Sequence, residues 1–240
     1  MSLSPTTVLP DLAATGSLHA SINLGNPVLA QGTPEAPAGV TVDITEELGR
    51  RLGVPVELHC FDAARKSFEA LASGETSLAF LAIEPAREAE IAFSPPYLVI
   101  EGVYLVPASS PLDAPGDVDR EGFRIGVKEG SAYDLFLSRT LQHATVVRGT
   151  DGVSVFHQAG LEVAAGIRQP VVEFATRHPE YRVIEERFMQ IRQAVGISRH
   201  AAAETVRFLA DFVEELKTSG FIAESLRRSG QDADLAANGV

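Results

Sequence analysis

The order in which strand-like and helix-like segments follow one another is the feature that most limits how this chain can fold. In the first third of the chain, short apolar runs typical of strands alternate with amphipathic segments typical of helices. The helical segment at 41–52 carries Ile44, Leu48 and Leu52 every four residues, which lines one face, and Gly53 is well placed to end it. This strand–helix alternation favours a mostly parallel sheet covered by helices.

The same alternation begins again after residues 109–121, a stretch rich in proline, aspartate and glycine. Beyond it, apolar runs predict strands at 123–127 and 163–167, and the segment at 131–141 has the pattern of a helix. The segment at 190–198 then predicts a long strand that leads to C-terminal helices. The chain is therefore expected to contain a second α/β unit.

Length and charge limit the partners that this chain can have. A chain of 240 residues suits one large domain or two small lobes. Its net charge of −12, with no basic cluster, argues against a nucleic-acid partner. No apolar run approaches the length of a membrane span, and the first twenty residues lack the basic start and continuous apolar stretch of a secretory signal.

The histidines and the cysteine do not follow any metal-binding spacing in the sequence. The histidines are scattered along the chain, with no pair at the usual ligand spacing, and they are His19, His59, His143, His157, His178 and His200. The single cysteine cannot form an internal disulfide. From the sequence we therefore expect no metal site and no cofactor.

The segment that says most about function begins with an apolar run at 78–83, which predicts a buried strand. This run ends in a turn that carries Glu84 and Arg87. A guanidinium just past the carboxyl end of a buried strand is well placed to bind a ligand carboxylate through two parallel hydrogen bonds. On spacing alone, a surface arginine paired with Glu88 or Glu90 is the commoner outcome.

The residues around this turn resemble the signature of the family 3 extracellular solute-binding proteins, the amino-acid receptors of ABC transporters. The positions that match at the right spacing are Pro85, Arg87, Phe93, Ser94, Pro96 and Tyr97. Glu84 and Ala86 stand where the family has threonine and glutamate. The resemblance extends over roughly residues 16–229.

The resemblance implies a periplasmic binding protein-like II fold: an α/β protein of two Rossmann-like lobes, with a ligand cleft between them and a two-strand hinge that joins them. The first lobe would be discontinuous, comprising residues 1–104 and 196–240 and so including the C-terminal helices. The second lobe would comprise residues 105–195. Discontinuity of this kind is implied by the resemblance and is not visible in the sequence itself.

The resemblance also implies a set of ligand-binding residues. Arg87 of the first lobe would hold the ligand carboxylate together with Ser131 and the Ala132 amide, which begin a helix of the second lobe. A helix N-terminus is a ready site for an anion, although on spacing alone Ser131 is more often just a helix cap. Asn26 lies in the first loop, and Lys66 lies close to where site residues of the family are found.

One departure from the family leaves the ligand open. The family commonly has an aspartate that binds the ligand ammonium, and here Arg168 lies near that position. Glu84 could replace this aspartate, or Glu84 could pair with Arg168 across the cleft. Alternatively, Arg87, Arg168 and Lys66 could serve a ligand with several acidic groups. Two buried cations need a compensating anion, so Glu84 or the ligand must supply it. The sequence slightly favours a carboxylate-bearing ligand that is not a standard amino acid.

The function implied by the resemblance is capture of a small carboxylate ligand, an amino acid or organic acid, by hinge closure, followed by delivery to an ABC transporter. Such a protein is a monomer and not an enzyme. It is periplasmic if a signal peptide has been removed and cytoplasmic otherwise, where a ligand-sensing module is the alternative. An enzyme resembling cyclohexadienyl dehydratase, with Glu84 as its acid, is the remaining alternative.

Overall fold

The computed structural model describes residues 5–239, and the chain divides into two compact units. The first unit consists of Met1–Val99 and Arg192–Val240, and the second unit is Ile100–Ile191. Both boundaries fall a few residues before the positions that the family resemblance implies. Residues 1–4 and 240, which the predicted first lobe includes, lie outside the described residues.

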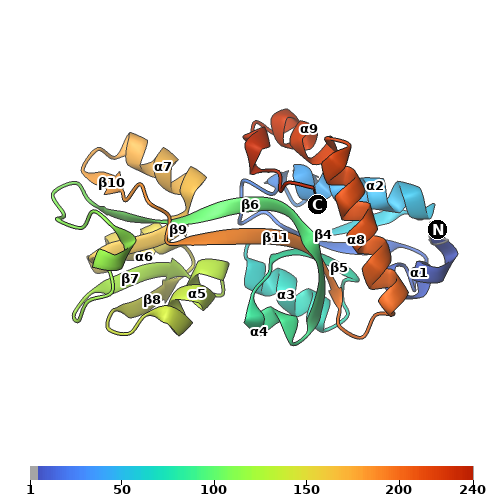
Figure 1. Cartoon of the computed structure of the whole chain (residues 1–240), viewed down its shortest axis with the longest axis horizontal. Helices are drawn as coiled ribbons and strands as arrows, with labels where there is room; N and C mark the ends of the chain where they lie inside the picture. Colours follow the sequence, from blue (N-terminus) through green and yellow to red (C-terminus); the bar gives the residue numbers. More distant parts are fainter. Residues whose placement is uncertain (1–4, 240) are drawn as a thin grey trace. The chain divides into compact units, whose positions relative to one another are not determined.

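The first unit is built mainly from strands and helices that alternate along the chain (Figure 1). Its helices and strands are α1 (Pro5–Leu12), β1 (Leu18–Asn23), β2 (Gln31–Thr33), β3 (Ala36–Ala38), α2 (Val40–Leu52), β4 (Val56–Phe61), α3 (Ala64–Ala72), β5 (Leu78–Ala82), α4 (Pro85–Glu88), α8 (Ala203–Thr218), α9 (Phe221–Arg228) and the short 3-10 helix η2 (Ala233–Leu235). The chain passes between the two units within β6 (Ile91–Pro107) and again within β11 (Met189–Ser198).

The sheet of the first unit has the strand order β4-β1-β5-β11. Strand β1 runs parallel to both β4 and β5, whereas β11 runs antiparallel to β5. The register with β4 extends from the pair Leu18 and Val56 to the pair Asn23 and Phe61. Helices α2 and α3 pack against β1 from opposite sides of this sheet (Figure 1). The carboxyl ends of β4, β1 and β5 therefore lie at one edge.

Apolar periodicity explains the elements of this unit. Every residue of β5 is buried, as expected for a central strand covered on both faces. In α2 the buried face includes Ile44, Leu48 and Leu52, and the helix ends at Gly53, whose φ of 71° lies in the left-handed region. The predicted helix and its terminating glycine are thus confirmed.

The second unit repeats the α/β pattern. Its elements, besides its parts of β6 and β11, are η1 (Pro115–Asp117), β7 (Arg124–Lys128), α5 (Ala132–Thr140), β8 (Thr145–Gly149), α6 (Gly152–Ala159), β9 (Val163–Ile167), α7 (Arg168–Arg177) and β10 (Tyr181–Val183). The strand order is β6-β9-β7-β8, with β10 beside β6. Because β7 runs parallel to β8 and β9, the helices α5, α6 and α7 all begin at one edge of this sheet.

The α/β class predicted from the sequence is confirmed, but several elements were missed. Helix α1 and the β2–β3 hairpin were not expected, and neither was a strand as long as β6, which runs from Ile91 to Pro107. The adjacent Pro95 and Pro96 hid the length of β6, since prolines usually exclude a strand interior. No helix in the range 5–239 is long and apolar enough to span a membrane.

Close packing at the start of α6 gives a prediction for stability. A Cβ added to Gly152 would lie 2.6 Å from the carbonyl oxygen of Ala165 and 3.0 Å from that of Gly126. Because both contacts are with backbone atoms, we expect Gly152→Ala to lower the free energy of unfolding by about 1–3 kcal/mol. Thermal unfolding followed by circular dichroism measures this change.

Gly116→Ala is the matched control, because Gly116 is exposed and a Cβ there would meet no atom within 4 Å. Its melting temperature should stay close to that of the wild type. Equal melting temperatures for all three proteins would show that the packing at α6 is looser than described.

Candidate functional site

Most of the predicted site residues of the first unit follow strands whose carboxyl ends share one edge of the sheet. The loop after β1 contains Asn26, the helix after β4 contains Lys66, and the short helix after β5 carries Arg87. Ligands of open α/β sheets usually bind outside this carboxyl edge. The fold thus places these residues where a ligand site is expected.

Arg87 is a deeply buried cation. Only 3% of Arg87 is exposed, and its Nη1 donates a hydrogen bond to the carbonyl oxygen of Ala82, at the end of β5, over 3.2 Å. Burial lowers the pKa of Arg87 to about 10, and the charge of Glu84 opposes this shift. The guanidinium therefore stays protonated at neutral pH, in surroundings where water does not weaken its attraction for an anion.

The backbone holds the turn that carries Arg87 in place. Glu84, also 3% exposed, precedes α4, and its carbonyl oxygen accepts hydrogen bonds from the amides of Arg87 (2.8 Å) and Glu88 (3.1 Å). The amide of Ile83 donates to the carbonyl oxygen of Arg192 in β11 over 2.9 Å. Glu84 and Arg87 are thus a buried pair of opposite charge on a turn fixed to the sheet. The surface arginine that is the commoner outcome of such spacing does not occur here.

Other residues of the signature have packing roles. Phe93 packs on a core cluster that includes Leu81 and Ile91. The Ser94 hydroxyl accepts a hydrogen bond from the amide of Val195 over 3.1 Å, which joins β6 to β11. Tyr97 is fully buried and meets Phe80 edge to face, with the ring centroids 5.8 Å apart; burial raises the pKa of its phenol. These residues support the scaffold around the Arg87 turn.

Asn26 and Lys66 already have polar contacts within their own segments. The side-chain oxygen of Asn26 accepts a hydrogen bond from the amide of Val28 over 3.1 Å, which closes the loop after β1. The Nζ of Lys66 lies 2.8 Å from a carboxylate oxygen of Asp62, and the lysine side chain is nearly half exposed. A role for either residue in ligand binding stays a prediction.

In the second unit, Ser131 caps α5. Its hydroxyl oxygen accepts a hydrogen bond from the amide of Asp134 over 3.1 Å, and the Asp134 carboxylate accepts one from the amide of Gly130 over 2.9 Å. Arg148 forms an ion pair with the same carboxylate at 3.0 Å. The helix start therefore has a protein carboxylate close to it, and a ligand role for Ser131 and the Ala132 amide stays a prediction.

Arg168, the first residue of α7, lies in an ion cluster of the second unit that the sequence did not indicate. Its Nε lies 2.6 Å from a carboxylate oxygen of Glu101, and its Nη2 donates to the carbonyl oxygen of Glu185 over 2.7 Å. Arg187 contacts the other carboxylate oxygen of Glu101 at 2.9 Å. Burial raises the pKa of Glu101, but the hydrogen bonds from Arg168 and Arg187 lower it more, so the pKa falls below its ordinary value. The charge of Arg168 is balanced within its own unit, without Glu84.

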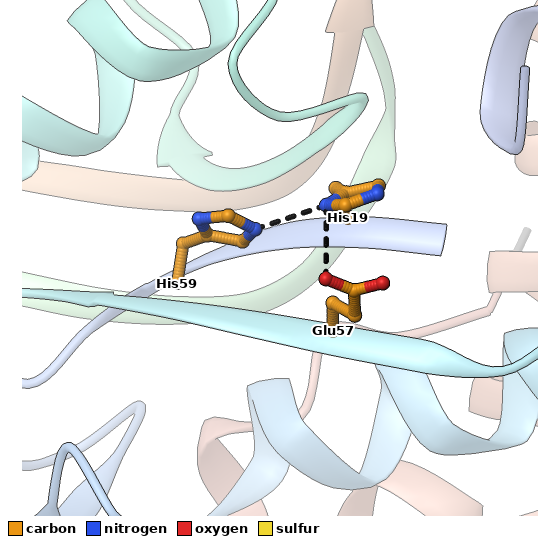
Figure 2. Close-up of side chains that lie close together, drawn as sticks. All are labelled: His19, Glu57 and His59. Atoms are coloured by element: carbon orange, nitrogen blue, oxygen red, sulfur yellow. Dashed lines mark hydrogen bonds and ion pairs between the residues drawn. The ribbon is translucent and has the colours of Figure 1, made fainter. Parts of the chain in front are cut away.

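Two of the histidines that are scattered along the sequence come together in the fold. His19 in β1 and His59 in β4 lie side by side, with Nδ1 of His19 3.0 Å from Nε2 of His59 (Figure 2). Glu57 joins them, with a carboxylate oxygen 3.7 Å from Nδ1 of His19. Among the described residues, these side chains are the group of histidines and carboxylates with ligand atoms close enough to share a metal ion. Strand pairing brings them together across the sequence.

Comparison with known proteins identifies the fold and the family. Residues 25–231 match the model of the bacterial extracellular solute-binding proteins, family 3. The cysteine-binding protein of Campylobacter jejuni superposes with a TM-score of 0.79 at 14% identity, over 96% of this chain and 99% of that chain. A mutant of ArgBP from T. maritima gives a TM-score of 0.76 at 17% identity, over 93% and 99%.

The names of two further relatives mention an enzyme and a sensor. An ancestral amino acid-binding protein, described as a precursor of cyclohexadienyl dehydratase, gives a TM-score of 0.75 at 15% identity, over 92% of this chain and 97% of that chain. The virulence sensor protein BvgS of Bordetella pertussis is 33% identical over 156 residues, which is 64% of this chain and 12% of the sensor. This chain therefore matches a small part of that sensor. The solved structures, at these identities, show the fold alone.

The ion cluster around Glu101 gives a prediction for pH dependence. The pKa of Glu101 in the folded state lies below the ordinary value of 4.5. The carboxylate therefore stabilises the fold fully above pH 4.5, and this contribution is lost as pH falls through the lowered pKa. We expect Glu101→Gln to lower the free energy of unfolding by about 1–3 kcal/mol at pH 7 and by progressively less in acid. Thermal unfolding between pH 7 and pH 3 measures the difference.

Glu185→Gln is the control, because this side chain is 94% exposed and contacts Arg168 mainly through its backbone oxygen. It should change stability by no more than about 0.5 kcal/mol at any pH. A Glu101→Gln deficit that stayed constant down to pH 3 would contradict the lowered pKa.

Proposed function

This chain belongs to the family 3 bacterial extracellular solute-binding proteins, and from that premise we propose that it binds a small ligand carrying a carboxylate through Arg87. The observation that carries the proposal is the buried guanidinium of Arg87 beside the buried carboxylate of Glu84, at the carboxyl edge of the first unit's sheet. A planar guanidinium binds a carboxylate through two parallel hydrogen bonds.

Glu84 makes an α-amino acid the favoured ligand class. Arg87 and Glu84 give the turn one charge of each sign, which suits the zwitterion of an α-amino acid. The alternative in which several cations bind a ligand with more than one acidic group loses support. Arg168 is paired with Glu101, and Lys66 is paired with Asp62. An organic acid without an ammonium remains the second class of ligand. The names of the solved relatives, which include binding proteins for arginine, lysine and cysteine, agree with this choice.

We propose that the second unit contributes Ser131 and the Ala132 amide to the same ligand. The start of α5 supports this role, since a helix N-terminus attracts a carboxylate. Strands β6 and β11 connect the units, so hinge closure about them would enclose the ligand. Arg168 would then act mainly through its ion cluster rather than by touching the ligand.

Delivery to the membrane component of an ABC transporter, as a periplasmic monomer, is the downstream step we propose, because several structural relatives are described as parts of such transporters. Sensing is the second candidate function, favoured by the 33% identity with part of the virulence sensor. Both functions begin with the same binding event. We propose binding without turnover. One structural relative is described as a precursor of cyclohexadienyl dehydratase, so turnover of prephenate would argue against this choice.

A thermal-shift panel tests the binding proposal. The panel contains the standard amino acids, dicarboxylates, keto acids and prephenate. A ligand at about one hundred times its dissociation constant should stabilise the fold by about 2.7 kcal/mol, which raises the melting temperature by about 5–10 °C. We expect a selective shift with one amino acid or a few related ones, and we expect Arg87→Met to abolish it, because the carboxylate loses its partner.

Arg50→Met is the matched control. Arg50 lies on the surface of α2, paired with Glu47, and its loss should leave the ligand shift unchanged. If no compound of the panel raises the melting temperature of the wild type, the proposed ligand class is overturned. Consumption of prephenate in the same samples would replace binding with catalysis.

A further inference from the structure

A second cluster of ligand-type side chains lies in the first unit, apart from the Arg87 turn. We propose that His19, Glu57 and His59 form a binding site for a divalent transition-metal ion of the zinc type. This inference goes beyond the proposed function, because it concerns a different site and a different ligand. Figure 2 shows the three side chains gathered over β1 and β4.

The distances between the ligand atoms suit a tetrahedral ion. Zinc binds imidazole nitrogen at about 2.0–2.1 Å, so two ligand atoms of a tetrahedral site lie about 3.3–3.5 Å apart. Nδ1 of His19 lies 3.0 Å from Nε2 of His59 and 3.7 Å from a carboxylate oxygen of Glu57. Both separations lie within a few tenths of an ångström of this range, and all three ligand atoms lie within 4.8 Å of one another.

The remaining ring nitrogens have the partners that metal-bound histidines usually have. Nε2 of His19 lies 3.0 Å from the hydroxyl oxygen of Thr15. Nδ1 of His59 lies 3.7 Å from a carboxylate oxygen of Glu75. Metal-binding histidines typically donate their other N–H to an oxygen of this kind, which fixes the ring and its tautomer. Each imidazole thus has one nitrogen turned toward the shared centre and an oxygen near the other nitrogen, at hydrogen-bond distance for His19 and at 3.7 Å for His59.

The chemistry of these side chains selects the class of ion. Imidazole nitrogen suits Zn²⁺, Ni²⁺, Co²⁺ and Cu²⁺, whereas Ca²⁺ and Mg²⁺ prefer sites made only of oxygen. With two imidazoles and one carboxylate as ligands, a tetrahedral ion keeps one position for water. We therefore infer a zinc-type site with an exchangeable fourth position.

The fold explains both the assembly of the site and its access. In the register of β1 and β4, His19 pairs with Glu57, and His59 pairs with Ser21 two residues further on, so the three side chains lie on one face of the sheet. The side chains of His19, His59 and Glu57 are 23%, 29% and 55% exposed, so an ion can reach them. A cavity of about 480 Å³ lined in part by Thr15, His19 and Glu75 lies beside His19.

Titration of the metal-free, tag-free chain with Zn²⁺ alone tests the proposal by calorimetry. We expect one ion to bind per chain with micromolar affinity or better. The double variant His19→Gln/His59→Gln should lose at least about 100-fold in affinity, and Glu57→Gln should lose about 10-fold. His143→Gln is the matched control, since this exposed histidine lies in the second unit, and it should bind like the wild type. Co²⁺ bound in place of Zn²⁺ should give the visible absorption of a four-coordinate ion.

The outcomes separate this site from a simple hydrogen bond between two imidazoles. No uptake of Zn²⁺ by the wild type at micromolar concentration would overturn the proposal, as would wild-type affinity in the double histidine variant. If the double variant does not fold, Glu57→Gln decides, because its largely exposed side chain is not needed for packing. Unchanged affinity in Glu57→Gln would then overturn the proposal. The amino-acid panel is independent of these results.

Discussion

The parallel pairing of β1 with β4 and β5 is the constraint on which the rest of the first unit depends. It places the loops after these strands at one edge of the sheet, where the turn with Glu84 and Arg87 begins. The same register puts His19, Glu57 and His59 together on one face. One set of backbone hydrogen bonds thus arranges two separate groups of polar side chains, which we assign to two different ligands.

Charge pairing is the second constraint, and it is met differently in the two units. In the first unit, the buried cation of Arg87 has the carboxylate of Glu84 beside it. In the second unit, Glu101 lies between Arg168 and Arg187. Since a buried charge without a partner is costly, the buried Arg87 has a counter-charge before any ligand arrives, whereas the partly exposed Arg168 pairs with Glu101. A bound carboxylate would therefore be a second anionic partner of Arg87, after Glu84.

The fold could be predicted where sequence pattern and local structure agree. The helix ended by Gly53 and the alternation of strands and helices follow from apolar spacing alone. The length of β6 could not be predicted, because Pro95 and Pro96 contradict a strand by local preference while tertiary pairing maintains it. The turn with Arg87 could be located from the family motif. Spacing alone favoured a surface arginine in an ion pair, but Arg87 is buried. Glu101 and the His19–His59 pair were missed, since their partners lie 67 and 40 residues away along the chain.

Binding of a ligand carboxylate by Arg87 can be tested by comparing a ligand with its own carboxamide. The ligand that gives the largest shift in the thermal-shift panel, and its carboxamide, would be titrated into the wild type and into Arg87→Lys. This variant keeps a cation beside Glu84. Loss of the charged acceptor should weaken binding to the wild type by roughly 10- to 100-fold, as expected for hydrogen bonds to a charged group. We expect a clearly smaller loss in Arg87→Lys, because lysine lacks the paired donors. An equal loss in both proteins would mean that a residue other than Arg87 binds the carboxylate.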